Sequence, residues 1–144
     1  METTDGQQPA PLAPLVLIAD DEAPIAEALA LIIEAAGYRT VIAKHGEEAL
    51  TLASAEPPAL VFTDLMMPRL DGAALIERLR ADALAAGREP PPVVLLTAAG
   101  MREASLSGAD AVLTKPFDLD EVEELLTRYL RPRGDPPTPD AGRA

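Results

Sequence analysis

The sequence predicts an α/β fold in which a doubly wound, five-stranded parallel sheet carries helices on both faces. Short apolar runs alternate five times with longer stretches whose apolar residues recur with helical period. The apolar residues of the short runs are continuous and do not alternate with polar ones, as expected for strands covered on both faces, while the helical stretches carry one apolar stripe each. In open sheets of this kind, ligands bind beyond the carboxyl ends of the strands, near the point where the strand order reverses.

The five strands are expected in the continuous apolar runs. They cover residues 15–19, 38–43, 59–63, 92–97 and 109–114. We expect the order 2-1-3-4-5 across the sheet; with this order the four strands that end in polar residues are contiguous.

The helices are expected between these strands and after the last one, at residues 23–37, 46–55, 72–87 and 118–130. The apolar stripes of the first and last helices are formed by Ile25, Leu29, Ile32 and Ile33, and by Val122, Leu125, Leu126 and Tyr129. Gly37 and Gly87 stand where a helix end favours a left-handed residue. Asp118 precedes the last helix as an N-cap, with Glu121 three residues later, which is typical of a capping box.

Weak structural signals are found between the fourth and fifth strands and at both ends. The stretch 100–108 contains two Gly and two Ser and has little apolar period, so the fourth helix is expected to be short or distorted. Residues 1–14 and 131–144 are rich in Pro, Gly and polar residues and are predicted to be disordered. The folded domain is therefore expected at 15–130.

The composition excludes several classes of function. With 24 acidic against 12 basic residues, the net charge of −12 would repel a phosphate backbone, so we expect no direct nucleic-acid binding. The absence of Cys and the single His, His45, leave no material for disulfides, thiolate zinc sites or Cys nucleophiles. The apolar run 15–19 is too short for a membrane span or a signal peptide, so a cytoplasmic protein without membrane association is expected.

Polar residues interrupt the apolar pattern at the ends of four strands. Asp20 and Asp21 follow the first strand, Asp64 ends the third, Thr97 ends the fourth and Lys115 follows the fifth. Because parallel strands end at one edge of the sheet, the five side chains are expected to converge. Each residue alone is more often structural than functional, but their coincidence at one edge indicates a functional site.

The residue types at this edge suggest a phosphoryl-transfer site. Three carboxylates would repel one another unless a hard divalent cation lies between them, and Mg²⁺ suits an all-oxygen site with few protein ligands. A carboxylate beside the metal can act as a nucleophile toward phosphorus and form an aspartyl phosphate. Mg²⁺, the Lys115 ammonium and the Thr97 hydroxyl could then each balance charge on one phosphoryl oxygen.

The strings LVLIADDE, VFTDLMMPRLDG, VVLLTA and GADAVLTKPF resemble, in order and spacing, the motifs of response-regulator receiver domains of two-component signalling systems, which are CheY-like and flavodoxin-like in fold. The resemblance covers the whole folded part. It implies that Asp64 is the phosphoacceptor and that Asp21, Asp64, the Met66 carbonyl and, mostly through water, Asp20 hold Mg²⁺. It further implies that Thr97 is the switch hydroxyl, that Lys115 pairs with the phosphate and that the peptide bond after Lys115 is cis.

The sequence departs from the family pattern in three places. Eighteen positions separate Thr97 from Lys115, about one helical turn fewer than is usual. Val112 stands where receivers often carry an aromatic residue. Met66 and Ala99, two positions after Asp64 and Thr97, are apolar and cannot orient an attacking water, so we expect a long-lived phosphorylated Asp64.

By this resemblance the protein is expected to be a phosphorylation-dependent signalling switch and not an enzyme in its own right. A histidine kinase or a phosphotransfer protein would load it. Because no effector sequence follows residue 130, a downstream protein target would be bound in trans, and phosphorylation could promote a homodimer. A phosphate-independent docking module remains an alternative. A phosphoaspartyl hydrolase is less favoured, since such enzymes need a second Asp at the position of Met66.

His45 is expected to be a solvent-exposed turn residue, and the acidic last helix is expected to be a solvated face.

Overall fold

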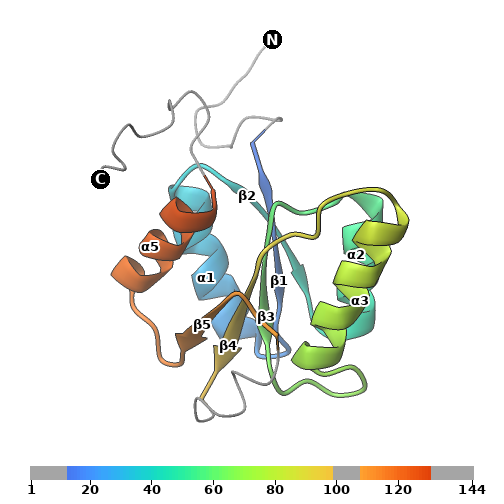
Figure 1. Ribbon diagram of the computed structural model, residues 1–144. Helices are drawn as coiled ribbons and strands as arrows, with labels where there is room; N and C mark the ends of the chain where they lie inside the picture. Colours follow the sequence, from blue (N-terminus) through green and yellow to red (C-terminus); the bar gives the residue numbers. More distant parts are fainter. Residues whose placement is uncertain (1–12, 99–107, 131–144) are drawn as a thin grey trace.

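The computed structural model describes residues 13–98 and 108–130 and shows a five-stranded parallel sheet between two layers of helices (Figure 1). The strand order is β2-β1-β3-β4-β5, as predicted. The strands are β1 (Leu15–Ala19), β2 (Arg39–Ala43), β3 (Leu60–Asp64), β4 (Val93–Thr97) and β5 (Ala111–Thr114). The strand order reverses beside β1, so the fold is doubly wound and the carboxyl ends of β1 and β3 lie next to each other at that point.

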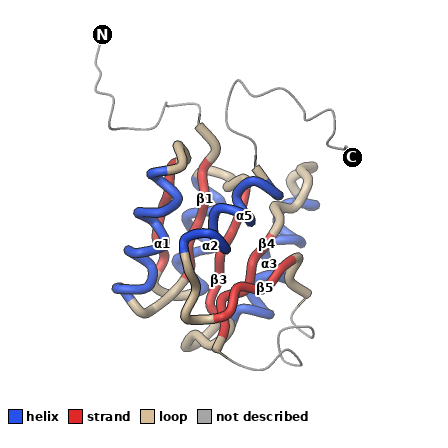
Figure 2. Tube along the Cα trace, turned by 90° about the vertical axis from the view of Figure 1, so that its left-hand side faces the viewer, coloured by secondary structure: helices blue, strands red, loops and turns tan. Residues whose placement is uncertain are grey.

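Among residues 13–98 and 108–130, four helices cover the sheet, two on each face. They are α1 (Ala23–Ala35), α2 (Gly46–Ala55), α3 (Gly72–Ala85) and α5 (Leu119–Tyr129). The pair α1 and α5 lies on one face and the pair α2 and α3 on the other (Figures 1 and 2). The short or distorted fourth helix was predicted in the stretch 100–108, of which residues 100–107 lie outside the described residues. None of the described helices is long and apolar enough to cross a membrane.

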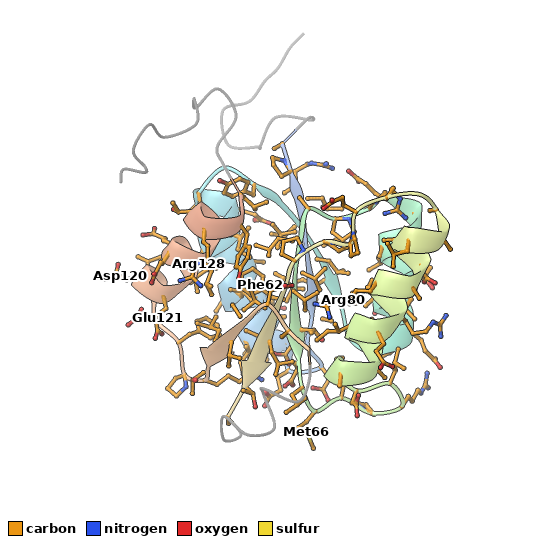
Figure 3. All side chains as sticks on the ribbon, viewed as in Figure 1. Phe62, Met66, Arg80, Asp120, Glu121 and Arg128 are labelled. Atoms are coloured by element: carbon orange, nitrogen blue, oxygen red, sulfur yellow. The ribbon has the colours of Figure 1, made fainter. Side chains whose placement is uncertain are left out.

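The apolar core is divided by the sheet into two clusters. Val16 and Ile18 of β1 pack under α1 and α5, whereas Leu17 and Ala19 pack under α2 and α3. Every residue of β1, β3 and β4 is buried, and Phe62 of β3 lies in the centre of the molecule (Figure 3). The three inner strands are therefore mostly apolar because helices cover both of their sides, and their polar residues, Thr63, Asp64 and Thr97, lie at the carboxyl ends of β3 and β4.

The buried face of α1 differs in part from the predicted stripe. Leu29 and Ile33 are fully buried as expected, but Ile25 and Ile32 are only half-buried. The positions between them against the sheet are taken by Ala26 and Ala30. Small side chains thus share the buried face of α1 with Leu29 and Ile33, while the half-buried Ile32 packs against the cluster.

The predicted helix ends are confirmed. Gly37 and Gly87 follow α1 and α3 with positive φ angles of 102° and 76°. Asp118 and Glu121 form the predicted capping box at the start of α5: each side chain accepts the backbone N–H of the other residue. Ala13, just before β1, was placed in the N-terminal extension by the sequence analysis, but it is buried. Its carbonyl oxygen accepts a hydrogen bond from Arg39 Nε at 2.9 Å.

Candidate functional site

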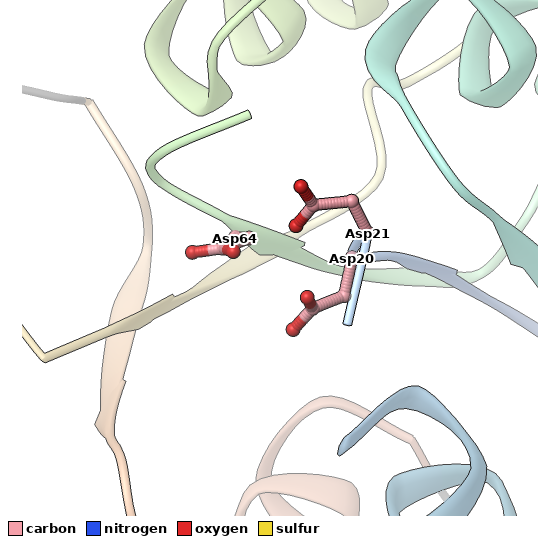
Figure 4. Close-up of side chains that lie close together, drawn as sticks. All are labelled: Asp20, Asp21 and Asp64. Carbon is pink, nitrogen blue, oxygen red and sulfur yellow. The ribbon is translucent and has the colours of Figure 1, made fainter. Parts of the chain in front are cut away.

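Three carboxylates meet at the carboxyl edge of the sheet (Figure 4). Asp20 and Asp21 directly follow β1, and Asp64 is the last residue of β3, the strand paired with β1 in parallel register. One carboxylate oxygen from each residue lies within 4.8 Å of the other two. The folding of the sheet thus brings together, as predicted, acidic side chains more than 40 positions apart in the sequence.

The surroundings of Asp20 fit a cation. Its side chain is buried, with 1% of the residue exposed. Oδ1 accepts the backbone N–H of Glu22 at 2.9 Å, but Oδ2 is the one buried side-chain nitrogen or oxygen among the described residues that lacks a hydrogen-bond partner. A buried carboxylate oxygen without a donor is costly. A divalent ion held by this oxygen, Asp21 and Asp64 would remove that cost, and hard oxygen ligands are those that Mg²⁺ prefers.

Lys115 provides the positive charge at this edge. It follows β5, and its side chain is 14% exposed. Its Nζ lies 3.2 Å from Asp20 Oδ2, 3.4 Å from Asp64 Oδ2 and 3.1 Å from Glu22 Oε1. The contact with Asp20 is an ion pair without hydrogen-bond geometry, so it leaves Oδ2 of Asp20 without a donor. The Lys115 ammonium therefore lies next to the carboxylate of Asp64, the residue that the sequence analysis predicts to be the phosphoacceptor.

The ionisation of Asp64 and Lys115 reflects this crowding. Burial raises the pKa of Asp64 and the Asp20 charge raises it further, while the charge of Lys115 acts in the opposite direction without cancelling the rise. Burial lowers the pKa of Lys115, but the hydrogen bond to Glu22 and the charges of Asp20 and Asp64 more than offset it, so the net shift is upward. Without a metal, the site therefore holds a fully charged amine above a carboxylate that ionises less readily than usual.

The backbones of Thr97 and Lys115 are joined by a hydrogen bond. Thr97 is the last residue of β4 and is buried, and its carbonyl oxygen accepts the Lys115 N–H at 3.0 Å. The peptide bond between Lys115 and Pro116 is cis, as predicted. Both predicted partners of the phosphoryl group thus belong to neighbouring strand ends, beside β3 and Asp64.

Met66 lies in the loop after β3. Its backbone N–H donates to Asp64 Oδ1 at 3.4 Å, and its side chain is 72% exposed and points away from the molecule (Figure 3). An apolar side chain in that position contributes no hydrogen bond to the site. Ala99, the other apolar residue singled out in the sequence, lies outside the described residues.

The sequence analysis missed the role of one residue near the carboxyl edge, Glu22, and misjudged that of another, His45. Glu22, the third acidic residue of the DDE string, was not assigned a role, although its carboxylate binds Lys115. His45 was expected to be an exposed turn residue, but it is half-buried and caps α2, its Nδ1 accepting the N–H of Glu48 at 3.2 Å. A residue directly before a Gly-Glu-Glu helix start was the signal that could have identified this cap.

Comparison of the chain with known protein families shows which family has this fold and this set of strand-end residues. The family model of the response regulator receiver domain matches residues 16–127. The chain belongs to this family. The receiver family acts in two-component signalling, its members are signalling domains and not enzymes, and they generally bind Mg²⁺.

The curated relatives of this receiver are longer proteins. It is 40% identical over 122 residues to the DNA-binding dual master transcriptional regulator RpaA of Synechocystis, covering 82% of this chain and 49% of the relative. It is 36% identical over 123 residues to the phosphate regulon transcriptional regulatory protein PhoB of Pseudomonas aeruginosa, covering 83% and 52%. The chain thus spans about half the length of the curated relatives that it matches.

Solved receiver structures match almost over their full length. A response regulator of Chloroflexus aurantiacus is 31% identical with a TM-score of 0.72, covering 81% of this chain and 97% of that one. The receiver domain of Saccharomyces cerevisiae Ssk1, solved with the histidine phosphotransfer protein Ypd1, is 28% identical with a TM-score of 0.73, covering 82% and 90%. The Ssk1 receiver thus forms a complex with a phosphotransfer protein.

Proposed function

We propose that this receiver is a phosphorylation-dependent signalling switch that accepts a phosphoryl group on Asp64. The observation that carries the proposal is the position of the Asp64 carboxylate: it lies next to the buried oxygen of Asp20 that accepts no hydrogen bond, and 3.4 Å from the Lys115 ammonium. A carboxylate with an oxygen cluster that suits Mg²⁺ on one side and a cation on the other is suited to attack an anionic phosphoryl donor.

The side chains at the carboxyl edge of the sheet suggest how the phosphoryl group would be transferred to Asp64. An oxygen of Asp64 forms a bond to phosphorus while the bond from phosphorus to the imidazole nitrogen of a phosphohistidine breaks, and the leaving imidazole is neutral or takes a proton from water. Asp20, Asp21, Asp64 and the Met66 carbonyl would hold Mg²⁺, which supplies positive charge to the transferred group. Lys115 pairs with one phosphoryl oxygen.

Thr97 would convert phosphorylation into a conformational signal. It ends the strand next to Asp64, and its backbone is bonded to that of Lys115. Hydrogen bonding of its hydroxyl to a phosphoryl oxygen would favour one of two arrangements of the segment that follows β4, which is a shift of populations between states. A change of the neighbouring surface then alters the affinity for a partner.

The partners proposed are proteins. A cytoplasmic histidine kinase or phosphotransfer protein would load Asp64, a role supported by the similarity to the Ssk1 receiver solved with Ypd1. A downstream protein would bind the phosphorylated form in trans, with dimerisation of the receiver as a further response. The net charge of −12 argues against contact of this chain with nucleic acid.

Intact-mass spectrometry after incubation with Mg²⁺ and acetyl phosphate tests the proposal. We expect a Mg²⁺-dependent gain of one phosphoryl group in the native protein and none in the Asp64→Asn variant. The matched control is Asp71→Asn, which removes a carboxylate from the same loop and is expected to leave labelling intact. Binding of Mg²⁺ without any phosphoryl uptake would contradict the switch and favour the phosphate-independent docking module.

A further inference from the structure

The Lys115 ammonium has three acidic neighbours, and they are not equivalent. Asp20 and Asp64 are buried carboxylates of the metal cluster, whereas the Glu22 side chain is 58% exposed and lies outside that cluster. Among the described residues, the contact from Nζ to Glu22 Oε1 at 3.1 Å is the one with hydrogen-bond geometry. The shortest and best-oriented contact of Lys115 is therefore made with a residue that the proposed function does not use.

The backbone of Glu22 is held firmly while its carboxylate is not. The Glu22 N–H donates to Asp20 Oδ1, and its carbonyl oxygen accepts the N–H groups of Ile25 and Ala26 in the first turn of α1. Glu22 is the N-cap residue of that helix, but its side chain makes no capping hydrogen bond. The side chain instead reaches from the start of α1 to Lys115, 93 positions away in the sequence. It can leave Lys115 without disturbing the helix.

Phosphorylation changes what Lys115 must bind. An ammonium has three N–H donors, and three carboxylate oxygens already lie within 3.4 Å of Nζ. A phosphoryl group on Asp64 brings new anionic oxygens into the same space. Of the existing contacts of Lys115, the exposed one with Glu22 is the least costly to give up to these oxygens, since water solvates the freed carboxylate.

We propose that Glu22 is the counter-ion of Lys115 in the unphosphorylated receiver and is displaced from it by the phosphoryl group. Glu22 is thus a positioning residue that holds Lys115 over Asp64 in the resting state and competes with the phosphoryl oxygens for the amine. This role rests on the proposed phosphorylation of Asp64. Its consequence is that Glu22 sets how readily Asp64 is loaded.

The first test measures the initial rate of phosphoryl uptake from acetyl phosphate at saturating Mg²⁺, by intact-mass spectrometry. We expect Glu22→Gln to raise the rate about two- to fivefold, the equilibrium factor that an ion pair with one exposed partner is worth. Glu22→Ala, which removes the acceptor as well as the charge, is expected to raise it at least as much. The control is Glu27→Gln, which removes the same charge from an exposed position of α1 and should leave the rate unchanged.

The second test is a double-mutant cycle on thermal unfolding in the absence of metal, with Glu22→Gln and Lys115→Met. We expect Glu22→Gln to lower the melting temperature in the native background but not beside Lys115→Met. An absence of this coupling, or a rate that is unchanged or lower with Glu22→Gln, would overturn the role of Glu22. If the native protein itself takes up no phosphoryl group, the proposed function fails and this inference fails with it.

Discussion

Gly72, the first residue of α3, packs directly against the backbone of Asp64. A β-carbon at Gly72 would lie 2.5 Å from the Asp64 carbonyl oxygen and 3.0 Å from the Leu65 α-carbon. The Gly72 N–H also donates to the carbonyl oxygen of Leu65 at 2.9 Å. The loop that carries Met66 is thus closed onto the end of β3, and the position of Asp64 depends on the absence of a side chain at Gly72.

Gly72→Ala is expected to destabilise the protein, because the new methyl group meets backbone atoms that cannot rotate away. Overpacking of this kind costs about 1–3 kcal/mol. The free energy of unfolding from urea denaturation measures it, and the rate of phosphoryl uptake should fall as Asp64 shifts. Ala81→Gly, an exposed substitution on the same helix, gives the size of a helix-propensity effect alone. An equally stable and equally active Gly72→Ala protein would show that the loop is not held as described.

Replacement of Asp64 by Asn should stabilise the metal-free protein at neutral pH. Burial and the Asp20 charge raise the pKa of Asp64 above its unfolded value, so its contribution to stability is present at low pH and is lost as the pH rises through the folded pKa. In EDTA at pH 7 we therefore expect Asp64→Asn to melt a few degrees higher than the native protein. The difference should shrink toward pH 4, and saturating Mg²⁺ should shrink it at pH 7. Equal melting temperatures in EDTA at pH 7 would contradict the raised pKa.

Loss of the Asp20 carboxylate should weaken Mg²⁺ binding. Its Oδ2 is the buried oxygen without a hydrogen-bond partner, so the ion has most to gain there. We expect Asp20→Asn to raise the dissociation constant for Mg²⁺ about 10- to 100-fold, as for other groups that support a metal site. Isothermal titration calorimetry measures the constant. Asp118→Asn, which changes a carboxylate away from the cluster, should leave it unchanged, and an unaltered constant for Asp20→Asn would place the ion elsewhere.

Met66→Asn should shorten the life of phosphorylated Asp64. The exposed Met66 thioether offers no hydrogen bond to an attacking water, whereas an amide at the same position can orient one. We expect the rate of hydrolysis of phosphorylated Asp64 to increase several-fold. The rate is measured as the loss of the added mass after the phosphodonor is removed. Met66→Leu, which remains apolar, should behave like the native protein. Rapid loss of the label from the native protein would contradict the expectation of a long-lived phosphorylated state.

Asp118→Ala should lower the stability without changing the site. Asp118 and Glu121 satisfy two backbone N–H groups at the start of α5, and removal of such a cap costs about 1 kcal/mol. Urea denaturation monitored by circular dichroism measures the loss. Asp120→Ala, in the first turn of the same helix but without a capping hydrogen bond, should cost less. An equal effect of both substitutions would indicate that helix electrostatics and not the cap is responsible.

The sheet and its polar edge could be predicted because their signals are local and repeated. Buried parallel strands produce continuous apolar runs, and the residue that ends each run must lie at the common edge. Asp20, Asp64, Thr97 and Lys115 therefore lie at neighbouring strand ends as the sequence indicated. The left-handed residues at Gly37 and Gly87 were equally predictable, since few other residues adopt positive φ angles at low cost.

The features that escaped prediction did so for different physical reasons. The contact of Glu22 with Lys115 joins residues 93 positions apart, and no local pattern indicates it. Ala26 and Ala30 face the sheet because helix packing selects small residues at close approach, whereas a hydrophobicity pattern ranks the Ile residues higher. His45 was judged by its turn-like neighbours, although a ring nitrogen can accept an N–H as well as an Asp or Ser oxygen does.

Both described ends of the chain lie at the amino edge of the sheet, opposite the acidic cluster. Ala13 enters β1 there, and Leu130 leaves α5 on the same side (Figure 1). A fluorophore, affinity tag or surface tether attached directly before Ala13 or after Leu130 would be separated from Asp64 by the full length of the strands. An immobilised or labelled receiver could therefore be used in binding assays with its carboxyl edge facing solution, and a signal from such a sensor would report on partners and not on an obstruction by the attachment.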